Sequence, residues 1–228
     1  MKMRLSKSKL MTYDQCPLRY KFEVVDGIRG EASPQMIKGS KLHSVFENFH
    51  KGIGSSKSIN RSDLVERMNK LGGGEYLDHL KNFINFNEFI LKQGGPLNFK
   101  PIAVEKKYYD EELDVVGVID AIYQFGDSVL ILDYKTGNHR PGYESSYRFE
   151  LAIYKMLWDK FNPEKKATHW GIYFSKTNYL WKEKFKSVSM KAMYKKIERL
   201  REKIENGEYE PKYSPLCRYC FFYDKCFG

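Results

Sequence analysis

Asp133 and Lys135 follow directly on the apolar run of residues 129–132, in the segment SVLILDYKTG. Side chains alternate across a strand, so we expect these two on one face and Tyr134 on the other. Burying them costs free energy unless an ion pair, or a metal ion together with a phosphate, compensates. Taken alone the D-x-K pattern is weak, because an aspartate and a lysine at a strand end are more often solvated edge charges.

A second carboxylate is expected beside this pair. Asp120 closes the preceding strand candidate, and a short connection through QFGD can bring it alongside Asp133. Two carboxylates at one sheet end offer oxygen ligands to a hard divalent cation, typically Mg²⁺ or Mn²⁺. A lysine two residues on can contact a phosphate oxygen or help to activate the attacking water. That is the equipment for metal-assisted phosphodiester hydrolysis.

One histidine adds to this predicted site. His43 lies at the border of the apolar stripe of a predicted helix, from where it can reach a site beside the core. Glu47 is one turn further on, and His50 nearly shares the angle of His43 on the helical wheel. A lone histidine in such a position is more often a packing residue.

Three further residues have two interpretations each. Glu105, in the strand candidate AVEKKYY, faces either the site or solvent. Glu150 and Tyr154 stand at i, i+4 on the helix after the D-x-K strand and so share one face. They orient the water, the lysine or DNA, or they form an ordinary helix flank.

Hydrophobic spacing predicts the elements that position these residues. It indicates helices over residues 35–51, 62–92 (interrupted at Gly72–Gly74 and ending near QGGP), 146–161 and 190–205. Strands are predicted over residues 102–109, 113–125, 128–134, 168–177 and 179–188. The predicted fold is α/β, a mixed central sheet flanked by helices in one domain. Its central strand is residues 129–132, which are apolar on both faces.

Four cysteines indicate a second metal centre. Cys217, Cys220 and Cys226 form a C-x2-C-x5-C array, and Cys16 lies 201 positions before Cys217. Four thiolates can hold a tetrahedral zinc ion or an iron–sulfur cluster, and spacing alone does not choose between them. Either would tie the N-terminal segment to the C-terminal tail.

The composition indicates which class of partner the protein binds and in which cellular compartment we expect it. The 228 residues carry a formal net charge of +10, which favours polyanions such as nucleic acid or an anionic membrane, or reflects a solvated lysine-rich surface. No apolar run reaches signal-peptide or membrane-span length. We therefore expect a cytoplasmic protein with no membrane partner, in which cysteines bind metal more often than they form disulfides.

In their joint order these motifs resemble the RecB-type branch of the PD-(D/E)xK nuclease superfamily. LSKSKLMTYDQCPLRYKFEVVDG is similar to its N-terminal segment and KGSKLHSVFE to its G-x-x-x-H-x-x-x-E helix. VVGVIDAIYQFGDSVLILDYKTG is similar to its paired G-x-x-D and D-x-K strands, and CRYCFFYDKC to its cluster tail. The chain looks most like the members with a four-cysteine cluster, the CRISPR-associated exonuclease of the spacer-acquisition module and the nuclease domain of the AddB subunit.

The resemblance implies a restriction-endonuclease-like core in a single nuclease domain. Residues 1–95 would be its mainly helical part and residues 96–187 the sheet core with the active site. Residues 188–228 would be a helix and a cluster-binding, cysteine-rich tail, closed by Cys16.

The resemblance also implies roles. His43, Asp120, Asp133 and the backbone carbonyl of Tyr134 would bind the catalytic Mg²⁺ or Mn²⁺, and Lys135 would serve the nucleophilic water. The thiolates of Cys16, Cys217, Cys220 and Cys226 would hold a [4Fe–4S] cluster rather than zinc.

One position departs from the family pattern. The helix after D-x-K usually carries Q-x-x-x-Y, and here Glu150 stands at the glutamine position, with Tyr154 at the tyrosine. A carboxylate there would repel phosphate unless it is protonated, paired or metal-bound.

The leading interpretation is a metal-dependent DNA exonuclease acting at single-stranded ends, in DNA repair, recombination or CRISPR spacer acquisition. The resemblance suggests a prokaryotic or viral source and a helicase or a CRISPR integrase as partner. One alternative is a DNA-end-binding or scaffolding subunit of such a complex. Another is a zinc-stapled nucleic-acid-binding protein.

Overall fold

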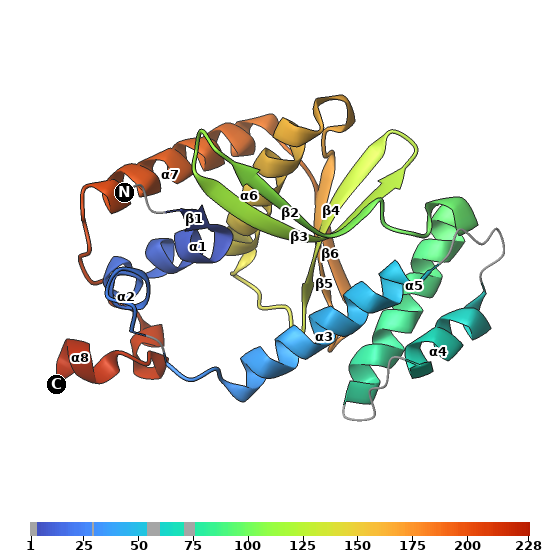
Figure 1. Cartoon of the computed structure of the whole chain (residues 1–228), viewed down its shortest axis with the longest axis horizontal. Helices are drawn as coiled ribbons and strands as arrows, with labels where there is room; N and C mark the ends of the chain where they lie inside the picture. The colour runs from blue at the N-terminus through green and yellow to red at the C-terminus, as the bar shows by residue number, and fades with distance from the viewer. Residues whose placement is uncertain (1–3, 29, 54–59, 71–75) are drawn as a thin grey trace. The chain divides into compact units, whose positions relative to one another are not determined.

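The computed structural model describes residues 4–28, 30–53, 60–70 and 76–228 (Figure 1). These residues form two compact units. The smaller consists of residues 1–32, 109–116 and 187–228, and the larger of residues 33–108 and 117–186. The prediction of one domain with three sections therefore stays a prediction. In the described ranges no helix is long and apolar enough to cross a membrane.

The larger unit is built on a mixed sheet. Its strands are β2 (Ala103–Asp110), β3 (Val115–Phe125), β4 (Ser128–Lys135), β5 (His169–Phe174) and β6 (Tyr179–Lys184). Strand β4 pairs antiparallel with β3 and parallel with β5, β6 pairs antiparallel with β5, and β2 pairs with β3. The predicted α/β fold with a mixed central sheet is confirmed, and β4 is an interior strand, as its apolar run predicts.

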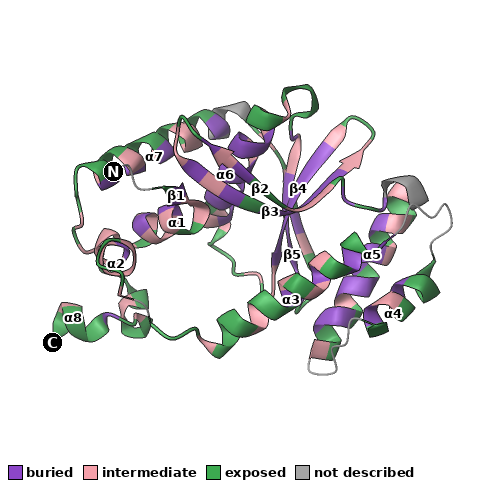
Figure 2. Cartoon of the chain, viewed as in Figure 1, coloured by how far each residue is buried: buried purple, intermediate pink, exposed green. Residues whose placement is uncertain are grey.

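Helices cover both faces of β4. They are α3 (Pro34–Lys51), α4 (Arg61–Lys70), α5 (Leu77–Asn98) and α6 (Glu144–Phe161), with a short 3-10 turn at Pro163–Lys165. Leu130, Leu132 and Tyr134 belong to a core cluster with residues of α3, α4 and α5, whereas α6 packs against β4 and β5. Each large apolar side chain buried in this way contributes roughly 1.5–3 kcal/mol to folding. Figure 2 shows β4 as almost entirely buried.

Glycine 117 lets α6 approach the sheet closely. A Cβ atom on Gly117 would lie 2.6 Å from Leu157 Cδ1 and 3.5 Å from the ring of Tyr154. Because 2.6 Å is far shorter than a non-bonded carbon–carbon contact, a larger residue would force the Leu157 side chain to move away from the sheet. The glycine thus helps to fix the position of Glu150 and Tyr154 above β3 and β4.

Two predicted helix boundaries fall near glycines. The predicted end near QGGP coincides with a kink at Gly95, whose φ of 67° is in the left-handed region, although the helical segment continues to Asn98. The predicted interruption at Gly72–Gly74 lies outside the described residues.

The smaller unit joins the two ends of the chain. It contains β1 (Leu5–Ser6), α1 (Lys7–Gln15), α2 (Pro17–Tyr20), a π-helical turn (Lys21–Val25), α7 (Ser187–Glu205), a 3-10 turn (Pro215–Tyr219) and α8 (Tyr223–Phe227). Strand β1 pairs parallel with Val115 and Val116. Lys196 of α7 lies 2.6 Å from Asp14 of α1, and Tyr13 donates a hydrogen bond of 2.5 Å to the carbonyl of Glu208. The N-terminal segment is therefore fastened to the C-terminal helix.

Candidate active site

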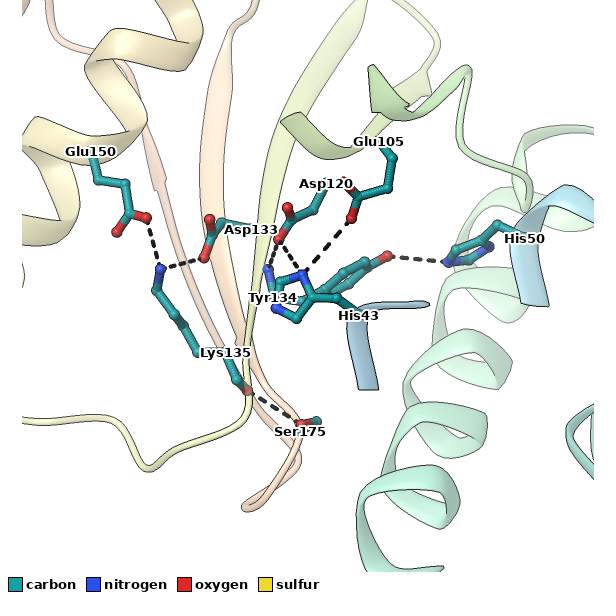
Figure 3. Close-up of polar contacts among 9 residues, drawn as sticks. All are labelled: His43, His50, Glu105, Asp120, Asp133, Tyr134, Lys135, Glu150 and Ser175. Atoms are coloured by element: carbon teal, nitrogen blue, oxygen red, sulfur yellow. Dashed lines mark hydrogen bonds and ion pairs between the residues drawn. The ribbon is translucent and has the colours of Figure 1, made fainter. Parts of the chain in front are cut away.

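Strand β4 presents an aspartate and a lysine toward α6. Lys135 Nζ lies 2.8 Å from Asp133 Oδ2 and 2.7 Å from Glu150 Oε1 (Figure 3). Asp133 and Glu150 are 1% and 6% exposed, respectively. The expected alternation is confirmed, because Tyr134 projects from the other face. Two buried carboxylates around a single ammonium group leave the site with net negative charge.

Asp120 lies beside this group but does not end its strand. The prediction that Asp120 closes the preceding strand is wrong, because β3 continues to Phe125. The reason is a tight hairpin in which Ala121 to Phe125 pair with Leu132 to Ser128. This register places Asp120 next to Asp133, as expected, and Asp120 Oδ2 accepts a 2.7 Å hydrogen bond from the backbone N–H of Tyr134.

His43 of α3 and Glu105 of β2 extend the acidic group. His43 Nδ1 lies 3.5 Å from Asp120 Oδ2 and 3.8 Å from Glu105 Oε1. Their ligand atoms lie within 4.8 Å of one another, and in the described ranges no other His, Cys, Asp or Glu group of three or more is that compact. Imidazole and carboxylate donors suit Mn²⁺ and, through the carboxylates, Mg²⁺. The residues therefore fit a divalent cation.

The backbone of Glu105 is unusual. Its φ of 45° lies in the left-handed region, which residues other than glycine seldom adopt. Such a conformation costs of order 1–3 kcal/mol and is concentrated at functional sites. Sequence reasoning left the direction of Glu105 open, since regular alternation along β2 does not predict a local left-handed residue. In the structure it faces the site.

The charge around His43 favours a cation. Burial lowers the pKa of His43, but its interaction with Glu105 and the charges of Asp120 and Asp133 outweigh burial and raise that pKa to about 9. The metal-free site thus holds an imidazolium at neutral pH, where a bound metal ion would supply the positive charge instead.

A cleft gives solvent access to these groups. Its volume is about 400 Å³. It is lined from α3 and β2 by Gly39, Ser40, His43, Ser44, Glu47 and Glu105. The metal-ligating side of the site is therefore open to a substrate.

Tyr154 lies close to the carboxylates on the α6 side. It is 2% exposed. Burial, followed by the negative charges of Asp133, Asp120 and Glu150, holds its pKa well above the ordinary value for a tyrosine. Tyr154 is therefore a neutral phenol in the field of the predicted metal ligands, and its role and that of Glu150 stay predictions.

The second histidine of α3 lies elsewhere. His50 is fully buried, and its Nε2 lies 3.1 Å from the hydroxyl of Tyr134. Burial, together with the charges of Arg67 and Lys100, lowers its pKa to about 3. His50 therefore packs against the face of β4 opposite to Asp133 and Lys135, and it is no part of the acidic group.

The four cysteines all belong to the smaller unit. All four are free thiols of intermediate burial. Burial raises the pKa of the Cys226 thiol, and the neighbouring thiols of Cys220, Cys16 and Cys217 raise it further. The cysteine sulfur atoms do not form a compact ligand set, because in the described residues the group of His, Cys, Asp and Glu with ligand atoms within 4.8 Å of one another is His43, Glu105 and Asp120.

Comparisons with known proteins bear on the family and the fold. The PD-(D/E)XK nuclease superfamily matches residues 4–227. A crystal structure from Eubacterium rectale, of a protein described as a candidate exonuclease, is similar in fold. The TM-score is 0.57 at 13% sequence identity, over 98% of this chain and 88% of that one. No curated protein matches the chain in sequence. Because the superfamily match spans almost every residue, the chain belongs to the PD-(D/E)XK nuclease superfamily.

Proposed function

We propose that the chain is a divalent-metal-dependent deoxyribonuclease that shortens DNA from single-stranded ends. The observation that carries this proposal is the convergence of His43, Asp120 and Asp133 with Lys135 at one end of the sheet. Superfamily membership supports hydrolysis of a phosphodiester bond. Action on single-stranded ends rests on the resemblance to the RecB-type branch.

In this proposal, four groups around Asp120 serve as metal ligands. His43, Asp120, Asp133 and the backbone carbonyl of Tyr134 would hold Mg²⁺ or Mn²⁺, with Glu105 as a further ligand or a partner of His43. When bound, the ion polarises the phosphate and lowers the pKa of a coordinated water. Asp120 also links β3 to β4, because it accepts the hydrogen bond from the Tyr134 N–H.

Lys135 is placed for the reacting phosphate. Asp133 and Glu150 hold its ammonium group at 2.8 and 2.7 Å. This pairing fixes the direction of a long side chain, which would otherwise lose rotamer freedom on binding substrate. Lys135 then contacts a phosphate oxygen or orients the attacking water.

Glu150 favours a second candidate function. A glutamate at the usual glutamine position adds a negative charge where phosphate must approach, although its pairing with Lys135 offsets that charge. If the offset is incomplete, the chain is a DNA-end-binding or scaffolding subunit with weak cleavage. Glu150→Gln separates the two functions: faster cleavage by the variant indicates the scaffold, and unchanged or slower cleavage indicates the nuclease.

The four cysteines would hold a [4Fe–4S] cluster in the smaller unit, or structural zinc. The presence of all four cysteines in one compact unit, and the spacing of the three in the tail, support one four-thiolate site. Colour distinguishes the cluster from zinc, because an iron–sulfur protein is brown and a zinc protein is colourless. Cys220→Ser should remove the chromophore and lower the melting temperature, and a variant with unchanged colour and melting would contradict the assignment.

The cellular setting follows the same resemblance. The +10 net charge supports binding to the DNA backbone, with an affinity that falls as salt rises. We infer a role in DNA repair, recombination or CRISPR spacer acquisition in the cytoplasm of a prokaryote or of a virus-infected cell. The partner would then be a helicase or an integrase.

The test is cleavage of 5′- and 3′-labelled single-stranded DNA by anaerobically purified protein. Reactions with Mn²⁺, Mg²⁺ or EDTA are run for the parent, for Asp133→Ala and for Asp127→Ala, an exposed aspartate in the β3–β4 turn. We expect metal-dependent shortening by the parent and Asp127→Ala only. Equal cleavage by Asp133→Ala would show that the metal site is misassigned. The labelled end gives the polarity of digestion.

A further inference from the structure

The C-terminal tail of the smaller unit, residues 209–228, exposes a dense group of aromatic rings. Figure 2 shows the segment around α8 as largely exposed. The exposed rings here are Tyr213, Tyr219, Phe221, Tyr223 and Phe227, with exposed fractions of 43–80%. The other exposed rings of the described residues are spread over the larger unit, at Phe89, Tyr143, Phe161 and Tyr179. Because exposed apolar surface is unfavourable in water, such a concentration marks an interaction surface.

Four of the tail rings divide into a group of three, Tyr213, Tyr223 and Phe227, and the separate ring of Tyr219. Tyr223 and Phe227 stack with centroids 4.7 Å apart and an interplanar angle of 27°, and Tyr213 lies 5.4 Å from Phe227. Tyr219, the most exposed of them at 80%, stands apart with the Arg218 guanidinium 5.8 Å from its ring centroid. The group of three rings and the Tyr219 ring both leave ring surface exposed, on which a planar group can stack.

Three cations accompany the rings. Lys212 donates to the carbonyl of Asp14 at 2.8 Å, and Arg218 donates to the carbonyl of Pro215 at 3.2 Å. Lys225 lies 5.9 Å from the ring centroid of Phe22. Within the described part of the chain, none of the three forms an ion pair with a carboxylate. Their positive charges are therefore available to an anionic partner.

We propose that this aromatic tail surface binds single-stranded nucleic acid. Unpaired bases stack on Tyr219 and on the Tyr213–Phe227–Tyr223 group, while Arg218 and Lys225 contact phosphates. Rings that offer a π-face beside cations are how proteins hold single strands without reading sequence. A protein partner would bury aliphatic side chains as well, and Leu216 is the exposed aliphatic residue of this tail. The proposal rests on the proposed function, since it adds a second contact surface for the single-stranded substrate of that function.

The experiment measures equilibrium binding of the anaerobically purified 228-residue Asp133→Ala chain to a fluorescein-labelled thymidine oligonucleotide. Tyr219→Ala should weaken binding roughly tenfold, as loss of one stacked base does. Tyr219→Phe should bind like the parent because the ring remains. Phe89→Ala removes an exposed ring of the larger unit and is the matched control. Because the Tyr219 side chain is 80% exposed, its removal should leave the melting temperature unchanged.

Salt dependence separates stacking from charge. Replacing Arg218 by alanine should reduce the slope of log affinity against log salt by about 0.7, the value for one phosphate contact to a single strand. Tyr219→Ala should lower the affinity without changing that slope.

Two outcomes overturn the proposal, and they differ in what they say about the function. If the parent cleaves single-stranded DNA but Tyr219→Ala and a Tyr213→Ala/Tyr223→Ala/Phe227→Ala variant bind it as tightly as their background, only the tail surface is wrong. If the parent neither cleaves nor binds single-stranded nucleic acid, the proposed function fails and the tail proposal fails with it.

Discussion

The two histidines of α3 lie seven residues apart on nearly the same line of one helix, yet their surroundings are opposite. His43 contacts Asp120 and Glu105, and its pKa is raised to about 9. His50 contacts Tyr134 and Tyr123 among aromatic rings, and its pKa is lowered to about 3. The helix supplies the same side chain twice, and the strands that it crosses decide whether that side chain is an imidazolium or a neutral imidazole.

The difference has a physical cause in the sheet. At the first histidine, carboxylates from β2 and β3 stabilise positive charge more than burial disfavours it. At the second, phenols and rings offer no negative charge, so desolvation dominates. We infer that the first histidine serves metal binding and the second serves stability, and four predictions test this division.

The largest effect should come from His43→Gln. Loss of one metal ligand removes several kcal/mol of transition-state stabilisation, so we expect cleavage to fall on the order of a thousandfold with Mn²⁺. Because charged His43 also stabilises the metal-free fold below pH 9, urea unfolding of the variant in EDTA is compared with the parent at or above that pH, where it should show no large loss of stability. A variant that cleaves within threefold of the parent rate would show that His43 does not serve metal binding.

His50→Phe should show the reverse pattern. The variant keeps a ring in the aromatic cluster but leaves the Tyr134 hydroxyl without its 3.1 Å partner. We expect the free energy of unfolding to fall by about 2 kcal/mol, the cost of losing one partner of a buried hydrogen bond. Cleavage per folded molecule should stay within a few-fold of the parent. A stable but inactive variant would mean that His50 acts in catalysis after all.

The acid response should sharpen the contrast. His50 has a pKa of about 3 when folded and about 6.5 when unfolded, so the unfolded state binds more protons between these values. The stability that neutral His50 gives is therefore present above pH 6.5 and is lost as the pH falls. We expect the parent to lose about 1.4 kcal/mol per pH unit more than His50→Phe between pH 6 and 4.

Urea midpoints of both proteins, measured in EDTA across that range, check this difference. Using the difference removes the shared contributions of the carboxylates and of His43. The stabilisation that His43 gives depends on pH in the opposite direction. Because the pKa of His43 is raised, this stabilisation is fully present below pH 6.5 and is lost as the pH rises through 9. Parallel pH curves for parent and variant would rule out a buried neutral His50.

The smallest effect should come from Lys51→Ala, at the end of the same helix. Lys51 pairs with Glu47 one turn away, and its side chain is 60% exposed. Exposed pairs of this type contribute about 0.3–0.5 kcal/mol, because water and salt screen them. We expect no change in cleavage and a melting temperature within about 1 °C of the parent. A larger loss of activity would place Glu47 among the residues that serve the cleft.

The sequence by itself determined the elements and the central part of the site. The spacing of apolar residues fixed α3, α6, α7 and the interior strand β4, because local periodicity depends only on which face of an element is buried. Alternation placed Asp133 and Lys135 on one face for the same reason. The motif order also pointed to the superfamily to which the chain belongs.

Only the tertiary structure decided how residues distant in sequence meet. The continuation of β3 past Asp120 and the ion pair of Lys135 with Glu150 are of this kind. Glu105 turns toward His43 through a left-handed backbone that regular strand alternation does not predict. These features depend on charges and hydrogen bonds between elements, and such terms are set by three-dimensional distance and burial rather than by position along the chain.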